Sequence, residues 1–150
     1  MKLCISLVVL SIIICAGLSY AGDTYNYKKD CPAAGPKNIP DKWNFYKCEC
    51  TSYVADKLNE DGVKFSNSYK KIKWGNASNW KSAAKNAGFS VNNTAKKGAV
   101  AWFSGHVAYV DRVDGKKVIL SEYNYNPPWG YKYSTREINA TSVSSFLHIK

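Results

Sequence analysis

The sequence predicts an α+β domain in which helices pack on one face of an antiparallel sheet of about six strands. After an apolar N-terminus, the chain shows helical periodicity only before Gly88. After Gly88 the period changes from helical to strand-like and stays so to the C-terminus. Helices followed by a run of strands are typical of this class, because each element must bury an apolar face against another layer.

The first 21 residues have the composition of a secretory signal peptide. A lysine precedes the almost wholly apolar run Leu3–Leu18, and small residues follow it. The run is shorter than the roughly 20 residues that a spanning helix needs. A lipid anchor on Cys15 is the alternative, although Ile14 stands where a small residue is required. We expect residues 1–21 to be cleaved, leaving a secreted protein, extracellular or periplasmic, without a stable membrane anchor.

The rest of the chain reads as an N-terminal arm, residues 22–42, and one domain, residues 43–150. The arm contains three prolines and little periodicity, so we predict an extended conformation for it. The domain length lies within the usual range of roughly 100–200 residues for a single unit.

Two helices are predicted in the first half of the domain. Apolar residues recur at four-residue intervals after Cys50, which indicates an amphipathic helix over Cys50–Asn59. A second helix is predicted through Trp80–Ala87, with Gly88 as its C-terminal cap. Between them, Val63–Trp74 fits either a loop or an irregular strand.

Six strands are predicted after the second helix. They are Phe89–Asn93, Ala99–Phe103, Val107–Val113, Lys117–Tyr125, Tyr131–Ile138 and Phe146–Ile149. Asp114-Gly115, between the third and the fourth strand, is a strong signal for a type I′ hairpin turn.

The chain is strongly basic. Of its 21 basic residues one is Lys2, so the mature chain keeps 20 basic and 11 acidic residues, a formal net charge of +9. This charge favours anionic partners, although a solvated lysine surface is the simpler alternative. We expect no nucleic-acid partner, because the chain has no recognition-helix pattern, glycine-rich phosphate loop or basic cluster. The histidines and cysteines lack metal-ligand spacing, so we expect no metal and no other cofactor.

The mature chain keeps three cysteines, Cys31, Cys48 and Cys50. Thiols normally pair in an oxidising compartment, and Cys48 is too close to Cys50 for an easy mutual bridge. We therefore predict a Cys31–Cys48 disulfide and a free Cys50, the alternatives being that Cys31 is the odd thiol or that Cys50 is merely buried. A thiol at a helix N-terminus is favoured as thiolate, which makes Cys50 a candidate nucleophile.

A cysteine nucleophile needs a base, and the mature chain has two histidines. His106 stands at the entry of a strand, whereas His148 lies in a strand of ordinary core character, so we expect His106 to be the base. If the next strand pairs with the His106 strand, Glu122 lies beside the imidazole and Asn124 faces the same side. The alternatives are a surface ion pair for Glu122 and a turn position for Asn124.

Three segments of the chain resemble the signature blocks of the CHAP domain, the cysteine, histidine-dependent amidohydrolases/peptidases. They are Cys50–Val54, Gly105–Val110 and Ser121–Tyr125. Their order and spacing are also similar to that family, as is Arg136 beyond the loop Pro127–Tyr131.

The resemblance implies a papain-like α+β fold and hydrolysis of amide bonds, most often in peptidoglycan. Matched position by position, it makes Cys50 the nucleophile, His106 the base and Glu122 the orienting acid, with Asn124 as an auxiliary polar group. The family often has Gly-Gln before the cysteine, where this chain has Cys48-Glu49. The source of an oxyanion-binding side chain is therefore open.

We expect a secreted, monomeric cysteine hydrolase that forms a thioester and acts on peptidoglycan or another anionic cell-wall polymer. The bond is either the one cut by an N-acetylmuramoyl-L-alanine amidase or a peptide bond cut by an endopeptidase. Tyr53, Tyr123 and Trp129 are expected to contact substrate. The alternative is a non-catalytic, basic module that binds cell wall or glycan on the same fold.

Overall fold

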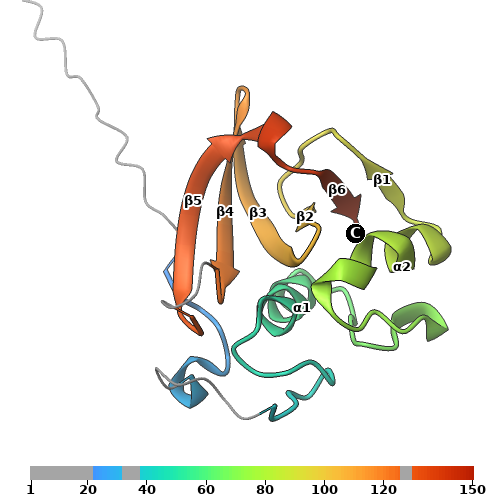
Figure 1. Ribbon diagram of the computed structural model, residues 1–150, viewed down its shortest axis with the longest axis vertical. Helices are drawn as coiled ribbons and strands as arrows, with labels where there is room; N and C mark the ends of the chain where they lie inside the picture. Colours follow the sequence, from blue (N-terminus) through green and yellow to red (C-terminus); the bar gives the residue numbers. More distant parts are fainter. Residues whose placement is uncertain (1–21, 32–37, 126–129) are drawn as a thin grey trace, which may run out of the picture.

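The prediction of a papain-like α+β fold is confirmed. The structure, a computed structural model, describes residues 22–31, 38–125 and 130–150. Helices α1 (Cys50–Glu60) and α2 (Trp80–Asn86) lie on one side of a six-stranded antiparallel sheet (Figure 1). The predicted signal peptide lies outside the described residues. No helix within the three described ranges is long and apolar enough to cross a membrane.

The six strands lie within two residues of their predicted ends and follow the spatial order β1-β6-β2-β3-β4-β5. Their bounds are β1 (Ser90–Asn92), β2 (Val100–Phe103), β3 (His106–Asp114), β4 (Lys117–Tyr123), β5 (Tyr133–Asn139) and β6 (Ser145–His148). Short 3₁₀ turns cover Lys28–Asp30, Tyr69–Lys71, Ala77–Asn79 and Ala140–Ser142. Val63–Trp74, for which the sequence left a loop or an irregular strand open, is a loop that contains the 3₁₀ turn Tyr69–Lys71.

The hairpin between β3 and β4 is confirmed, but its predicted turn is wrong. Asp114 pairs with Lys117, so the two loop residues are Gly115 and Lys116. A type I′ turn needs a positive φ at both loop residues, and of the two only Gly115 has one, at 56°. A positive φ at the first loop residue alone is the pattern of a type II′ turn, which places glycine there.

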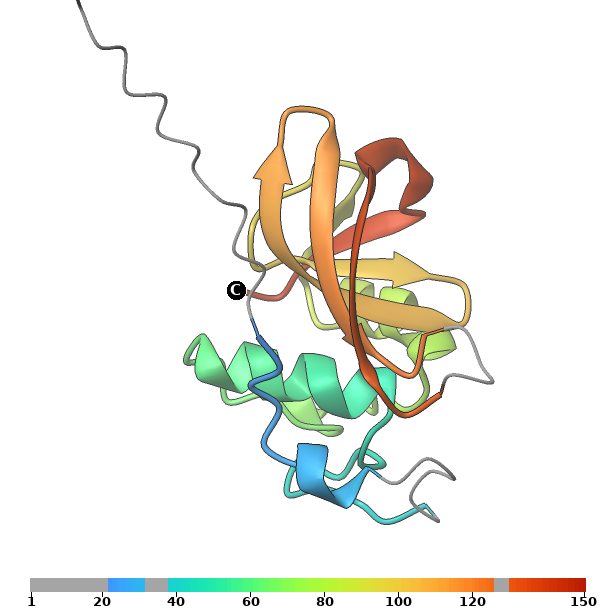
Figure 2. The ribbon, with the colours of Figure 1, turned by 90° about the vertical axis from the view of Figure 1, so that its left-hand side faces the viewer.

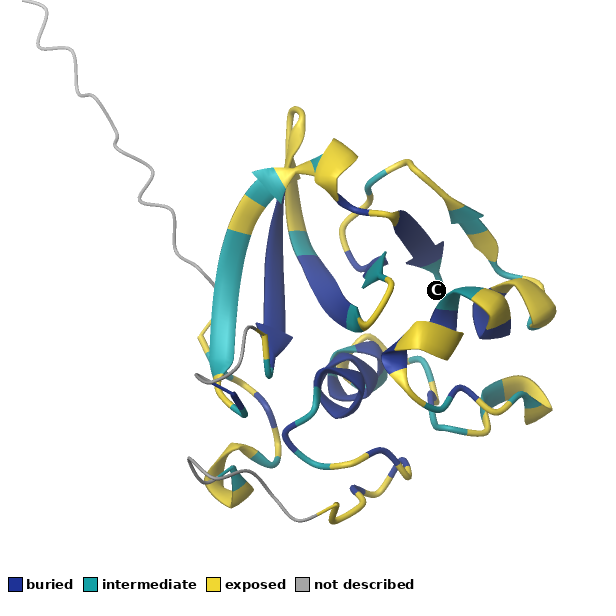
Figure 3. Cartoon of the chain, viewed as in Figure 1, coloured by how far each residue is buried: buried dark blue, intermediate teal, exposed yellow. Residues whose placement is uncertain are grey.

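The sheet separates two apolar clusters, because its side chains alternate between faces. Along β3, Val107 and Tyr109 face the helices, whereas Ala108 and Val110 face the other side. Figure 3 shows the resulting buried band along β3, β4 and β6. His106 has the same parity as Ala108, so its side chain starts from the face opposite the helices.

The described start of the N-terminal arm, residues 22–31, contributes to the core. Residues 22–31 run alongside α1 (Figure 2), and Tyr25 is only 1% exposed. The Tyr25 ring packs between Tyr53 and Tyr123, with ring centroids 5.8 and 4.6 Å away. The sequence of the arm has no periodicity that would indicate this burial, because a single aromatic anchor can bury a segment without any.

The arm also explains why α1 is buried on both sides. Every residue from Cys50 to Asp56 is buried, polar ones included. Ser52 is hydrogen-bonded to the Tyr25 hydroxyl at 2.6 Å, and Asp56 accepts hydrogen bonds from Asn26. The amphipathic pattern in the sequence therefore marks a face toward the sheet and a second, polar face covered by the arm.

Candidate active site

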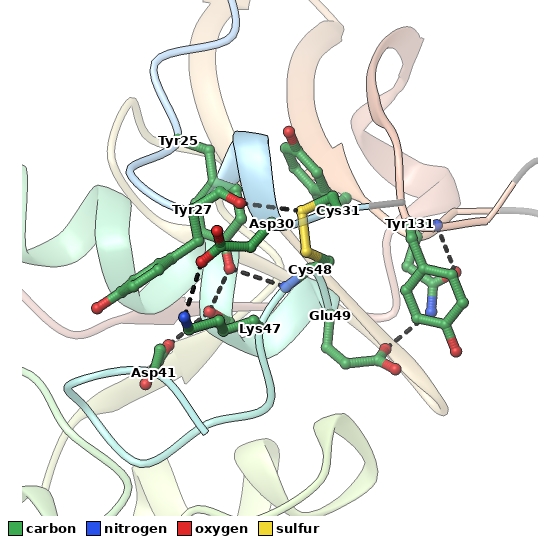
Figure 4. Close-up of a disulfide and its surroundings, with 12 residues drawn as sticks. Tyr25, Tyr27, Asp30, Cys31, Asp41, Lys47, Cys48, Glu49 and Tyr131 are labelled. Carbon is green, nitrogen blue, oxygen red and sulfur yellow. Dashed lines mark hydrogen bonds and ion pairs between the residues drawn. A yellow bond between two sulfur atoms is a disulfide. The ribbon is translucent and has the colours of Figure 1, made fainter. Parts of the chain in front are cut away.

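Cys50 begins α1 and is a free, mostly buried thiol, 8% exposed. The other two cysteines of the described residues, Cys31 and Cys48, form the predicted disulfide (Figure 4). Cys48 has a φ of 66°, in the left-handed region that favours glycine. In this chain the bridge to Cys31 therefore anchors a strained backbone position two residues before the candidate nucleophile.

His106 and Glu122 lie side by side, as the sequence predicts. They come from neighbouring strands β3 and β4, which pair in antiparallel register. His106 Nε2 is 2.8 Å from Glu122 Oε2, and the Glu122 side chain is fully buried. Because Nε2 is engaged by the carboxylate, Nδ1 is the imidazole nitrogen left for the Cys50 thiol.

Arg136 completes this group, and sequence reasoning assigned it no role. Its Nε donates to Glu122 Oε1 at 2.5 Å, and its Nη2 donates to Glu122 Oε2 at 3.1 Å. The guanidinium also stacks on the exposed Tyr125 ring, 3.6 Å from its centroid. The register of the two strands explains the contact, because Arg136 pairs with Leu120 across β4 and β5, and Leu120 and Glu122 share a face.

The surroundings of His106 favour its protonated form. Burial by itself lowers the pKa of the imidazole, but hydrogen bonds to Cys50 and Glu122, together with the charges of both, raise that pKa to about 9. The imidazole therefore carries a proton at neutral pH. An imidazolium beside a helix-terminal thiol is the arrangement that stabilises a thiolate.

Asn124 does not lie on the strand face of Glu122, which corrects its predicted position. Strand β4 ends at Tyr123, and Asn124 has a φ of 53°, so the alternation of side chains stops there. Its amide donates to the Glu49 carboxylate at 2.8 Å and accepts from the Tyr131 N–H at 3.1 Å. Asn124 thus connects the chain next to Cys50 with the start of the segment that leads into β5.

Two of the three predicted substrate contacts are core residues. Tyr53 is 1% exposed and Tyr123 is 2% exposed, with their ring centroids 5.3 Å apart. The prediction is wrong because the N-terminal arm covers both rings. The third residue, Trp129, lies outside the described residues.

A cavity of about 460 Å³ lies beside the first turn of α1, where Thr51 forms part of its wall. Its other polar walls come from Asn44, Tyr46, Asn67, Lys73, Asn76 and Asn79. Amide, hydroxyl and ammonium groups around an aromatic ring are suited to a polar peptide or sugar.

Known proteins resemble this chain in sequence and in structure. Staphylococcal secretory antigen SsaA of Staphylococcus aureus is 35% identical over 147 residues, which cover 89% of this chain and 54% of the relative. Staphylococcal secretory antigen ssaA2 of the same species is 40% identical over 107 residues, 67% of this chain and 37% of the relative. The chain therefore spans about half, or less, of the length of these relatives.

Among solved structures, the crystal structure of an N-acetylmuramoyl-L-alanine amidase from Staphylococcus aureus is similar, with 26% identity and a TM-score of 0.60. The match covers 77% of this chain and 34% of that chain. The sequence model of the CHAP domain matches residues 40–124, more than half of the chain. The chain thus belongs to the CHAP domain family.

Proposed function

We propose that this protein is a secreted cysteine hydrolase that cleaves amide bonds of peptidoglycan. The observation that carries the proposal is the connected series of a helix-terminal thiol, an imidazole and a buried carboxylate: Cys50, His106 and Glu122. Membership of the CHAP family and likeness to an amidase support the same chemistry. The Cys31–Cys48 disulfide and the secretory names of the relatives support secretion.

In the proposed mechanism the Cys50 thiolate attacks the carbonyl carbon of the scissile amide. His106 then gives its proton to the leaving amine, and a thioester remains on Cys50. Water resolves the thioester with His106 as the base. Glu122 holds the imidazole through Nε2, which leaves Nδ1 to exchange protons at the reacting atoms.

The Cys50 N–H is the proposed oxyanion donor. Within the described residues it has no hydrogen-bond partner, as expected for the first residue of a helix. It lies at the positive end of the α1 macrodipole. Loss of one such donor in other hydrolases costs roughly a hundred- to a thousandfold in rate.

The basic surface and the polar cavity support a cell-wall substrate. A formal charge of +9 on the chain after residue 21 attracts anionic polymers. The cavity is lined by Thr51, the residue after Cys50, and offers amides, Lys73 and an exposed Tyr46 ring. Peptide and sugar parts of a peptidoglycan unit carry the hydrogen-bonding groups that such walls bind.

The test is mass spectrometry of fragments released from purified peptidoglycan. We expect the protein to release either free stem peptides, as an amidase does, or cut peptides, as an endopeptidase does. Cys50→Ala should reduce release by roughly 10⁴-fold or more while still binding the polymer. Binding without release by the wild-type protein, under conditions where Cys50 is reduced, would instead favour a non-catalytic wall-binding module.

A further inference from the structure

Glu49 differs electrostatically from the other three glutamates of the protein. Glu60, Glu122 and Glu137 each form an ion pair with a lysine or an arginine. Glu49 is half-buried, and the only partner of its carboxylate within the described ranges is the neutral amide of Asn124. The buried Asp41 and Asp56 also bind neutral groups, so what distinguishes Glu49 is that its carboxylate without a basic partner belongs to the residue before Cys50.

The Glu49 carboxylate is held in a fixed position immediately before Cys50. It extends toward Tyr131 in Figure 4, where it accepts the amide hydrogen of Asn124 at 2.8 Å. The Asn124 oxygen accepts from the Tyr131 N–H, and a side chain at Gly130 would come within 2.9 Å of that oxygen. Close packing and the left-handed backbone of Asn124 thus fix the amide that orients Glu49.

Neither of the simpler explanations of Glu49 requires its charge. It precedes the first residue of α1, yet its side chain makes no capping hydrogen bond to the helix. It also ties α1 to Asn124, but a neutral glutamine at residue 49 would accept the same hydrogen bond. The negative charge next to the nucleophile is therefore not explained by the helix cap or by Asn124, and such a charge attracts positively charged groups.

We propose that Glu49, oriented by Asn124, is a binding site for a positively charged amine of the substrate, close to the scissile amide. The chemical class is a peptide with a primary ammonium group, on a side chain or at a terminus. The inference rests on the proposed hydrolase function for its substrate. The charge preference at Cys50 follows from the position of Glu49 alone, and it can be measured without turnover.

The first test compares how fast Cys50 reacts with thiosulfonates of opposite charge. The thiolate attacks the sulfenyl sulfur of the reagent, a mixed disulfide forms, and methanesulfinate leaves. The probes are the trimethylammonioethyl and sulfonatoethyl methanethiosulfonates, and intact-protein mass spectrometry follows the labelling. We expect Glu49→Gln to lower the cation-to-anion rate ratio by about five- to tenfold.

Glu60→Gln is the matched control, since it removes one carboxylate charge at the far end of α1, about 15 Å away. It should leave the rate ratio within about twofold of wild type, because solvent screens charges at that distance. Equal effects of Glu49→Gln and Glu60→Gln on the rate ratio would overturn the proposal, because the overall charge of the protein would then explain the charge preference at Cys50. An unchanged ratio in Glu49→Gln would overturn it as well.

The wild-type protein provides a measurement that needs no variant. Raising salt from about 0.01 M to about 1 M shortens the screening length from about 30 to about 3 Å, so the ratio should fall toward that of Glu49→Gln. A ratio that does not respond to salt contradicts the proposal even if the variant fails to fold.

The second test uses peptidoglycan before and after acetylation of its free amines. Acetylation should slow the wild-type protein by about five- to tenfold and leave Glu49→Gln nearly unaffected. If wild type releases nothing from either preparation, the proposed hydrolase function fails, while the thiosulfonate ratio still decides the role of Glu49. If wild type cuts both preparations equally, the ammonium site fails and the hydrolase function stands.

Discussion

Two buried carboxylates of this protein, Glu122 in the sheet and Asp41 beside α1, have opposite electrostatic surroundings. Glu122 lies between an imidazole and a guanidinium that donates two hydrogen bonds. Among the described residues, the Asp41 carboxylate receives hydrogen bonds only from neutral groups, the Ser52 hydroxyl and the N–H groups of Trp43 and Phe45. Burial, only partly offset by these donors, raises the pKa of Asp41 above its usual range.

The two carboxylates differ in what the protein requires of them. The proposed role of Glu122 depends on its negative charge, whereas Asp41 only needs hydrogen-bond donors for its oxygens. In the proposed mechanism Glu122 acts through its charge on His106, and Arg136 compensates that charge inside the protein. Asp41 instead fixes the turn before α1, where neutral donors are sufficient. Substitutions in the first network should therefore reduce both activity and stability, and substitutions in the second should reduce stability alone.

Removing the guanidinium should have the largest effect. Arg136→Met leaves Glu122 buried without its cation, so we expect kcat/KM to fall by roughly a hundredfold. The free energy of unfolding should fall by about 3–5 kcal/mol. Chemical denaturation and peptidoglycan hydrolysis measure the two effects, with Arg112→Met as the exposed control on β3.

The double variant Arg136→Met/Glu122→Gln refines this test. Removing both charges should recover most of the lost stability but not the activity, because the imidazole loses its orienting charge. Wild-type activity in the single variant would show that Glu122 does not need Arg136.

On the structural side, the Tyr25 hydroxyl joins the arm to α1. It accepts the Cys48 N–H at 2.9 Å and is hydrogen-bonded to Ser52 at 2.6 Å. Tyr25→Phe should lower the free energy of unfolding by about 1–3 kcal/mol, because the buried N–H loses its acceptor. Thermal denaturation measures this, with Tyr46→Phe on the exposed Tyr46 as control. At temperatures where the variant is folded, kcat should stay within about twofold; a large loss of kcat would contradict the separation of the two networks.

The imidazolium should set the alkaline limit of activity. In the proposed mechanism His106 gives a proton to the leaving amine. With a pKa of about 9, it loses that proton as pH rises through this value, so kcat/KM should fall above it. Glu122→Gln should move this limit to lower pH, since Glu122 raises the pKa of His106. A pH–rate profile measures both. If Glu122→Gln leaves the alkaline limit unchanged, Glu122 does not raise the pKa of His106 and this prediction is contradicted.

Asp41 should produce the smallest effect, visible in stability against pH. Its pKa is raised in the folded protein, so the unfolded chain releases this proton first as pH rises. The stability that protonated Asp41 contributes is complete below about pH 4 and is lost as pH rises through the raised value. The free energy of unfolding of Asp41→Asn should therefore rise relative to that of wild type between acid and neutral pH. Denaturation at a series of pH values measures this, with Asp114→Asn at the exposed Asp114 as control. A constant difference across this range would contradict the raised pKa.

Sequence patterns predicted the parts of the molecule that depend on local periodicity. The strand positions are correct to within two residues, and so is the start of α1. The proximity of His106 to Glu122 is correct because two strands joined by a tight hairpin must lie side by side. The disulfide was predictable too, since three thiols with two of them close together leave few pairings. The roles assigned to the site residues remain proposals.

The errors arise where distant segments meet. Tyr53 and Tyr123 were expected at a groove, but aromatic residues look alike in a groove and in a core until the covering segment is known. The contact of Arg136 with Glu122 depends on the register of β4 and β5, which the sequence does not specify. Asn124 was misplaced because a single residue of positive φ ends the strand alternation.

The position of the Tyr25 ring has a practical consequence for anyone dividing this protein into fragments. The family match begins at residue 40, yet Tyr25 fills the space between α1 and the sheet from outside that match. A shortened gene that starts at residue 40 would encode α1 with an open apolar slot and Cys48 without its bridging partner. We therefore expect the smallest part of the chain that folds on its own to be longer than the region matched by the family model.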